Sequence, residues 1–483
     1  MIQAPPAATW SVRRESTPLV VLGLATGSFM VLFGYLSIRN VQSFAQHAFD
    51  LAIFDQGMWL LSRFQDPFST IIGLPLFADH SSYILVLLVP LYWLWADPRV
   101  LVLVTVAALA AGAPITYALC RTLGAARVLS LVTALAYLLH PVATWNIWDG
   151  FHPEVLVIPL LLAAFLLIVR DRPWWGLALV LISLLAKEDV GLVVVPLGIY
   201  IAWVLGKKKV GTAMIVAGTA AFVFNVMVLL PALSTTGELI HTERYTHLGD
   251  GVFGIVAGIF TQPSLVAGEL FGESALLYMA ILVLPLPLSL LAPRLLLTGV
   301  PFLMVNLLSN SPFQNDFRYH YTYYLFVVVV LAAATGAGWV AGRPQRQRLA
   351  GATLTVVMAV AWHLAVGPNP VTNTDAWGVD AVLSEQFGGA VALVPAGDTI
   401  SAWESSVLSL SHRHGIYLFP NPFRDLSYGT ASDFPPDPAV VQWVLVRLDQ
   451  HPALQPDVAE VLASPDFETV YQAGPVILLR RRG

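Results

Sequence analysis

The chain has 483 residues, of which 57% are hydrophobic and only 11% are charged, and its mean hydropathy is +0.71. Soluble proteins carry about 25% charged residues, so this composition excludes an ordinary soluble protein and indicates a surface that largely faces lipid. The net charge of −5 is small and spread along the chain, which disfavours nucleic acid as a partner. The single cysteine, Cys120, excludes an internal disulfide.

Apolar runs of the length of membrane helices recur up to residue 366. A spanning helix needs about 20 apolar residues. The first run is too long for a cleaved signal peptide, so we expect it to be retained as an anchor in the plasma membrane. The runs are 18–38, 82–95, 99–119, 128–144, 154–169, 173–186, 190–205, 210–232, 274–291, 295–309, 321–341 and 349–366.

The basic loops orient these runs, because Lys and Arg collect in short cytoplasmic loops. If 82–95 crossed the membrane, every later basic loop would lie outside. That run is short and contains Pro90, so we predict an interfacial or re-entrant helix inside a long first outer loop, 39–98. Eleven spans remain, with the N-terminus in the cytoplasm and the C-terminus outside. The cytoplasmic clusters are then Arg13/Arg14, Arg121/Arg127, Arg170/Arg172, Lys207/Lys208/Lys209, Arg294 and Arg343/Arg346/Arg348.

Runs 173–186 and 190–205 form a predicted hairpin with short arms. Each arm has about 14–16 residues, or roughly 21–24 Å at 1.5 Å per residue, and the hydrocarbon core is about 30 Å thick. We therefore expect the hairpin tip, Lys187-Glu188-Asp189, to lie below the outer lipid surface. Three charges at that depth need partners or a water-filled cavity.

The stretch 367–483 is more polar and cannot span a membrane. Its short β-like runs are 391–394, 415–419, 442–447, 468–473 and 475–480, and helix-like segments cover 404–411 and 456–463. These patterns predict a small α/β domain outside the membrane. The predicted fold class is therefore mainly α: a polytopic membrane helical bundle over 1–366, followed by an extracytoplasmic α/β domain over 367–483.

With this topology, the unusual polar residues gather at the outer ends of helices. Each of them also has a purely structural interpretation. Acidic residues in outer loops can simply be solvated, and His152 can belong to a capping turn. The three charges of the 187–189 tip can neutralise one another, and Arg318 with His320 can anchor a helix. The candidate site residues are Asp50, Asp55, His80, His152, Glu154, Lys187, Glu188, Asp189, Arg318 and His320.

Carboxylates and imidazoles together could also hold Mg²⁺ or Mn²⁺. The first candidates for such ligands are Asp50, His152 and Glu154. They come from separate loops, so their spacing leaves metal binding open.

At these residues the sequence resembles a family of multi-pass predicted membrane proteins, defined as a domain of unknown function and grouped with the GT-C glycosyltransferase superfamily. The resemblance covers nearly the whole chain. It rests on Phe49–Gln56 (FDLAIFDQ), Phe151–Glu154 (FHPE), Ala186–Asp189 (AKED), Arg318–Tyr321 (RYHY) and the stretch from Ser401-Ala402-Trp403 to Phe419-Pro420.

The resemblance implies a GT-C-like enzyme in a membrane lipid environment. Such enzymes take a sugar from a polyprenyl-phosphate carrier and attach it to an extracytoplasmic acceptor, here a cell-envelope glycan, lipid or protein. Their first outer loop carries an essential acidic residue soon after helix one, which corresponds to Asp50 or Asp55.

Inverting transfer needs a carboxylate base, and Asp50 is the first choice, with Asp55 second. Lys187 and Arg318 could face the leaving phosphate. His80, His152 and Glu154 could bind the sugar, shuttle a proton or hold a metal.

Two other classes of function remain. A transporter or lipid flippase would carry charges or broken helices near the bilayer midplane and repeated halves, but the charges here lie at helix ends and no repeat is visible. A non-catalytic membrane scaffold would bind a partner through its outer domain and would have no polar cavity where the outer loops converge.

Overall fold

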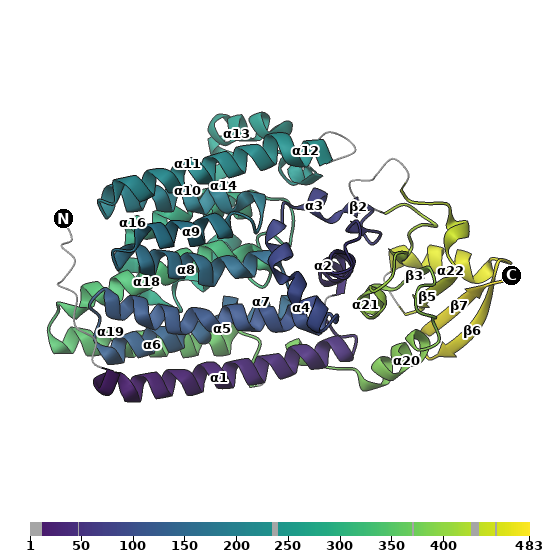
Figure 1. Cartoon of the computed structure of the whole chain (residues 1–483), viewed down its shortest axis with the longest axis horizontal. Coiled ribbons are helices and arrows are strands. Elements are labelled where there is room, and N and C mark those ends of the chain that lie inside the picture. Colours follow the sequence, from purple (N-terminus) through teal and green to yellow (C-terminus); the bar gives the residue numbers. More distant parts are fainter. Residues whose placement is uncertain (1–11, 47, 234–239, 370, 427–433, 450–451) are drawn as a thin grey trace.

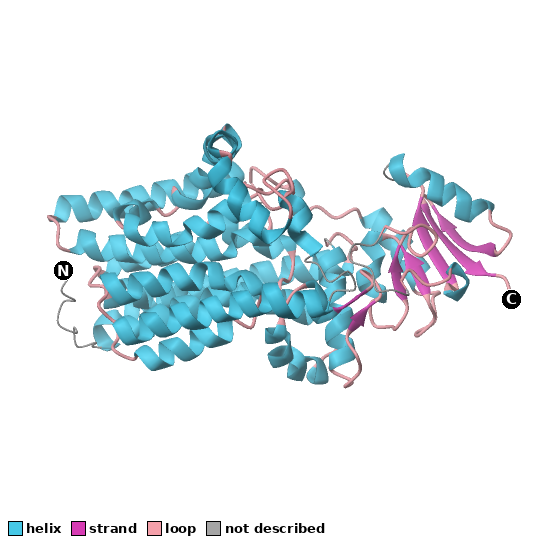
Figure 2. Ribbon diagram, turned by 90° about the horizontal axis from the view of Figure 1, so that it is seen from above, coloured by secondary structure: helices cyan, strands magenta, loops and turns pink. Residues whose placement is uncertain are grey.

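The computed structural model describes residues 12–46, 48–233, 240–369, 371–426, 434–449 and 452–483. A bundle of roughly parallel helices occupies one end of an elongated molecule, and a small sheet domain occupies the other (Figures 1 and 2). Helix α1 begins at the end of the bundle that is farthest from the sheet domain.

Long apolar helices build the bundle. Their principal members are α1 (Val12–Gln42), α5 (Arg99–Thr122), α6 (Arg127–Leu138), α7 (Pro141–Asp149), α8 (Val157–Val169), α9 (Pro173–Ser183), α10 (Gly191–Ile199), α11 (Lys208–Phe224), α15 (Glu273–Val283), α17 (Val300–Leu307), α18 (Tyr323–Ala341) and α19 (Gln345–Val366). Shorter helices are α12 (Leu230–Leu233), α16 (Pro293–Leu296) and the pair α13 (Gly251–Thr261) and α14 (Pro263–Phe271).

Burial separates the central helices from the lipid-facing ones. In the span that contains α18, 78% of the most apolar window is buried, whereas only 11% is buried in α19, which is slightly less apolar. A helix that is hydrophobic on all sides is either enclosed by protein or exposed to lipid. Helix α18 is therefore the centre of the bundle, and α19 lies at its periphery.

Within the described residues, six helices are long and apolar enough to cross a membrane, or seven if α13 and α14, bent by 86°, count as one span. The expected eleven spans require shorter apolar helices such as α9 and α15 to cross as well, so that count stays a prediction. The sequence analysis assigned no helix to the α13–α14 stretch.

The segment 39–98, predicted to be the first outer loop, is largely helical. Its elements are α2 (Ala48–Leu61), β1 (Phe68–Ser69), β2 (Leu74–Pro75), α3 (Leu76–Asp79), a 3₁₀ turn (Tyr83–Leu88) and α4 (Val89–Leu94). The turn and α4 occupy the run expected to be an interfacial helix, and Trp93 and Leu94 are exposed there. Helix α2 is buried on most sides and lies between the bundle and the sheet domain (Figure 1).

Five strands form one mixed sheet in the C-terminal part, in the order β4-β3-β5-β7-β6. Strand β3 pairs in parallel with β4 and β5, whereas β7 pairs antiparallel with β5 and β6. The elements are α20 (Ala381–Val391), β3 (Ile400–Ala402), α21 (Glu404–Val407), β4 (Ile416–Leu418), β5 (Trp443–Arg447), α22 (Gln455–Ala463), β6 (Phe467–Ala473) and β7 (Val476–Arg481).

The sheet confirms the small C-terminal α/β unit, but one expected strand is wrong. Residue 391 ends helix α20, whose N-terminus is capped by the Asp380 carboxylate accepting from the Leu383 N–H. The first strand of the sheet is β3 instead. Strand β3 has only three residues, all of them buried, and so short a segment shows no periodicity by which it could be recognised.

Several contacts attach the sheet domain to the end of α1. The Arg39 guanidinium donates to the Trp377 carbonyl, and the Ser384 hydroxyl donates to the Ser43 carbonyl at 2.7 Å. The rings of Phe44 and Phe387 lie 5.5 Å apart. One hydrophobic core is continuous through both parts. The boundary proposed at residue 366 coincides with the end of α19.

The packing of α18 gives a first prediction. A Cβ added at Gly336 would lie 1.9 Å from the Leu288 carbonyl oxygen, and that backbone atom cannot move aside easily. Overpacking of this kind costs about 1–3 kcal/mol, so Gly336→Ala should lower the thermal denaturation temperature in detergent. The matched control is Gly27→Ala in α1, where a Cβ meets nothing within 4 Å. Equal stability of the two variants would contradict the α18 packing.

Candidate active site

A small polar cavity lies where α2 meets the ends of the bundle helices. Its volume is about 50 Å³. Six of the expected site residues line it, namely Asp50, His80, His152, Glu154, Lys187 and His320. The other lining residues are Ile53, Phe54, Asp79, Arg244 and Tyr321.

Asp50 and His152 face each other across this cavity. The His152 Nε2 atom lies 3.4 Å from Asp50 Oδ2, and the Asp50 side chain is 48% exposed whereas His152 is 4% exposed. Partial burial works to raise the pKa of Asp50, but the hydrogen bond and positive charge of His152 outweigh this and lower the pKa of Asp50. Asp50 is therefore an ionised and accessible carboxylate with a buried imidazole behind it.

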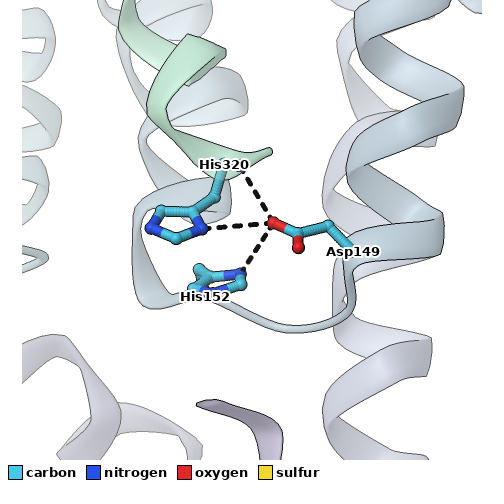
Figure 3. Close-up of side chains that lie close together, drawn as sticks. All are labelled: Asp149, His152 and His320. Carbon is cyan, nitrogen blue, oxygen red and sulfur yellow. Dashed lines mark hydrogen bonds and ion pairs between the residues drawn. The ribbon is translucent and has the colours of Figure 1, made fainter. Parts of the chain in front are cut away.

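Behind His152, the Asp149 carboxylate joins two histidines (Figure 3). Asp149 Oδ2 accepts a hydrogen bond from the His320 backbone N–H at 2.9 Å, and it lies 3.1 Å from His320 Nδ1 and 3.6 Å from His152 Nδ1. Burial works to lower the pKa of His152, but Asp149 and Asp50 outweigh burial and raise it. The imidazole of His152 is thus held between two carboxylates.

The local backbone explains why Asp149 and His152 meet. Asp149 ends helix α7, and Gly150 follows with φ 105°, a conformation that favours glycine. The chain changes direction at Gly150, so His152 lies next to the C-terminal end of α7. Asp149 was missing from the expected site residues, and its spacing of three residues from His152 was the only signal for it in the sequence.

Among the described residues, Asp149, His152 and His320 are also the group whose ligand atoms gather within 4.8 Å of one another. The two imidazole rings are stacked, with centroids 3.6 Å apart and 19° between their planes. An imidazole binds a metal through a lone pair in the ring plane, and one ion cannot lie in two nearly parallel planes. The observed arrangement fits a carboxylate shared by two imidazoles, and metal binding there requires one ring to rotate.

The hairpin tip brings three charges to the site, and each one has a partner from another segment. The Lys187 ammonium lies 2.7 Å from Glu154 Oε1, and Glu188 Oε1 lies 2.9 Å from His80 Nδ1. The Asp189 carboxylate accepts a hydrogen bond from the Tyr324 hydroxyl at 2.8 Å. Buried charges require such pairing.

Four of the expected site residues lie outside the cavity lining, namely Asp55, Glu188, Asp189 and Arg318. Asp55 is fully buried on α2, and the Arg318 guanidinium pairs with Asp316 at 2.6 Å. Arg244 lines the cavity instead and donates at 3.3 Å to both Gln314 Oε1 and the Tyr321 hydroxyl. Arg244 could not be predicted as a site residue, because its segment between two apolar runs carries no recognisable motif.

A large apolar groove of about 550 Å³ adjoins the polar cavity, and Asp79 lines both. Glu188 and Asp189 also border the groove. Its apolar walls come mainly from α10, α11, α13 and α17 and the segment after α11, and they include Leu192, Phe222, Val226, Val252, Ile259 and Met304. The site as a whole therefore offers a polar, charged pocket at the edge of a long hydrophobic surface.

Comparison with known proteins now adds the family. Residues 40–473 match the family described as "Predicted membrane protein (DUF2079)". The chain belongs to the DUF2079 family. This confirms the resemblance seen in the sequence. No protein of curated function matches this DUF2079 protein.

Its fold is similar to that of a solved protein, ArnT from Cupriavidus metallidurans. ArnT from Cupriavidus metallidurans bound to undecaprenyl phosphate aligns with TM-score 0.50 and 12% identity, over 94% of this chain and 98% of ArnT. The apo form of that ArnT gives TM-score 0.52 and 11% identity over the same shares of both chains. The Archaeoglobus fulgidus oligosaccharyltransferase in its apo form gives TM-score 0.44 and 11% identity, over 92% of this chain and 73% of that one. At these identities, ArnT shares the fold of this DUF2079 protein.

The buried ion pair gives a second prediction for this DUF2079 protein. Lys187→Met removes one partner and leaves the Glu154 charge uncompensated, which costs about 3–5 kcal/mol, so thermal unfolding in detergent should occur at a clearly lower temperature. The double variant Lys187→Met/Glu154→Leu should recover much of that loss. The control is Arg480→Ala, which breaks the exposed pair with Glu468. A single variant as stable as this control would contradict the pairing.

Proposed function

We propose that this protein is a glycosyltransferase that moves a sugar from a polyprenyl-phosphate donor to an extracytoplasmic acceptor. One observation carries the proposal: an accessible carboxylate and two cations line a polar cavity that adjoins a long apolar groove through Asp79. A lipid-linked sugar has the same division into a polar head and an apolar tail. The ArnT that shares this fold is bound to undecaprenyl phosphate.

Asp50 is the general base in this proposal. It is the exposed carboxylate of the cavity, and its lowered pKa keeps it ionised at neutral pH. Asp50 takes the proton of the acceptor hydroxyl as the hydroxyl oxygen attacks the anomeric carbon. The acceptor is a cell-envelope glycan, lipid or protein. His152 behind Asp50 holds the carboxylate in place and favours its charged form.

Lys187 and Arg244 stabilise the leaving lipid phosphate. Both line the cavity, and cations fixed near developing negative charge lower the barrier for its departure. Arg318 was expected in this role, but its pairing with Asp316 outside the lining favours Arg244. His80, Glu154 and His320 then form the walls that bind the sugar.

We also propose that the site faces the outside of the cell, with the N-terminus in the cytoplasm. Helix α1 begins at the end of the bundle opposite the sheet domain (Figure 1), which agrees with basic cytoplasmic loops and an outer C-terminal domain. The convergence of the outer polar residues on one cavity disfavours a scaffold. Metal binding is a separate proposal. It requires one of the two imidazole rings beside Asp149 to rotate.

A third prediction tests the base. Asp50→Asn should lower sugar transfer by about 10²–10⁴-fold, because it removes the proton acceptor. The measurement is transfer of radiolabelled sugar from a panel of undecaprenyl-phosphate-linked sugars to cell-envelope acceptors by the purified protein in detergent. The matched control is Asp66→Asn, an exposed residue of the same outer loop. Full activity of Asp50→Asn would contradict the assignment.

A fourth prediction concerns pH. His152 lowers the pKa of Asp50, so His152→Gln should raise that pKa and protonate Asp50 at a higher pH. The acid limb of the kcat/KM profile should therefore move to higher pH, with activity recovered as the pH rises. An acid limb that stays in place in His152→Gln would show that the two side chains do not act together.

A further inference from the structure

Asp55 and Asp50 lie on different sides of α2. Five residues of α-helix correspond to a rotation of roughly 140°. The Asp50 side chain is 48% exposed in the cavity, whereas Asp55 is 0% exposed. A carboxylate enclosed to this degree cannot reach an acceptor hydroxyl, so Asp55, the second choice for the base, needs a different role.

The Asp55 carboxylate connects three separate segments. Its Oδ1 accepts a hydrogen bond from the Tyr92 hydroxyl of α4 at 2.6 Å. Its Oδ2 accepts from the Ser411 hydroxyl and lies 3.0 Å from His412 Nε2. Ser411 and His412 belong to the sheet domain, in the segment between α21 and β4. One buried side chain therefore joins α2 to the interfacial helix and to the sheet domain.

The neighbouring residues of α2 extend this contact. The Gln56 amide donates at 3.0 Å to the Arg413 carbonyl and to the Thr70 hydroxyl. The Trp59 ring stacks on His412, with centroids 5.8 Å apart and 15° between the planes. A whole side of α2 is thus occupied by the sheet domain and by the strand segment of the same outer loop.

A Ser-His-Asp hydrolytic triad is a different interpretation of Ser411, His412 and Asp55. In such a triad the serine hydroxyl donates to the histidine, which the aspartate orients. Here the Ser411 hydroxyl donates to Asp55 and to the Leu408 carbonyl. The hydrogen bond from serine to histidine is therefore missing among these three residues. The observed contacts instead attach the sheet domain to α2.

Helix α2 has only 14 residues. Isolated helices of this length are marginal in water, so tertiary contacts decide where such a helix lies. We propose that Asp55 is a positioning residue: by fixing α2 to the interfacial helix and to the sheet domain, it sets the place of Asp50 in the cavity. The sheet domain is then a part of the catalytic assembly. This inference rests on the proposed function, in which Asp50 is the base.

The docked segment also approaches the site itself. Helix α21 packs against α2 and begins with Glu404. Burial raises the pKa of Glu404, and the charge of Asp50 raises it as well. Glu404 therefore belongs to the segment of the sheet domain that packs against α2, the helix that carries the proposed base.

The test compares Asp55→Asn, Tyr92→Phe and Ser411→Ala with the control Asp66→Asn. Two measurements are made on the full-length protein in detergent: hydrogen–deuterium exchange of residues 48–61, and sugar transfer with its pH profile. All three variants should exchange faster in 48–61 and show kcat lowered about 3- to 30-fold, with the acid limb unmoved. Ser411→Thr, which keeps the hydroxyl, should restore both values.

Two results would overturn the inference. One is unchanged exchange of 48–61 in Asp55→Asn, whatever its activity. The other is a loss of transfer as complete as in Asp50→Asn without faster exchange, which would make Asp55 the reacting carboxylate. The proposed function fails on different evidence, namely absence of transfer by the unmodified protein from every donor in the panel. The exchange measurement needs no substrate, so the two failures can be told apart.

Discussion

The pairing of buried charge organises the end of this bundle that adjoins the sheet domain. The Lys187 ammonium and the Glu154 carboxylate are each about 6% exposed and lie 2.7 Å apart. Removing two charges from water is costly, and the cost is offset only when the groups meet with good geometry. The hairpin tip and the loop before α8 must therefore come together, and Glu188 and Asp189 are drawn to His80 and Tyr324 by the same requirement.

Helix α2 lies between these paired charges and the sheet domain, and it carries a functional residue on each of the two sides. Its Asp50 side faces the paired charges and meets His152, while its Asp55 side faces the sheet domain. Because α2 carries a polar residue on each side, neither side of the helix can face lipid or an apolar core without leaving that residue unpaired. The helix is consequently fixed between the two parts of the molecule, although it is too short to be stable alone.

The neighbouring apolar groove offers the space that the lipid chain of the proposed donor requires. A polar pocket of about 50 Å³ is too small for a whole lipid-linked sugar, but the adjoining groove offers about 550 Å³ of mostly apolar space. Asp79 belongs to both. An amphipathic ligand could therefore place its charged group next to Lys187 and Arg244. Its apolar chain would then lie in the groove, where burying apolar surface away from water is favourable.

The amino-acid pattern alone predicts the membrane class, the long apolar helices, most strands of the C-terminal sheet and the polar residues at helix ends. Hydrophobic period and charge count are local properties, so they can be read without a structure. The folded chain was needed to show that Asp149 joins His152 to His320, that Arg244 lines the cavity, and that Asp50 and Asp55 face different surroundings. Those facts depend on which distant segments meet, and residue spacing along the chain does not contain that information.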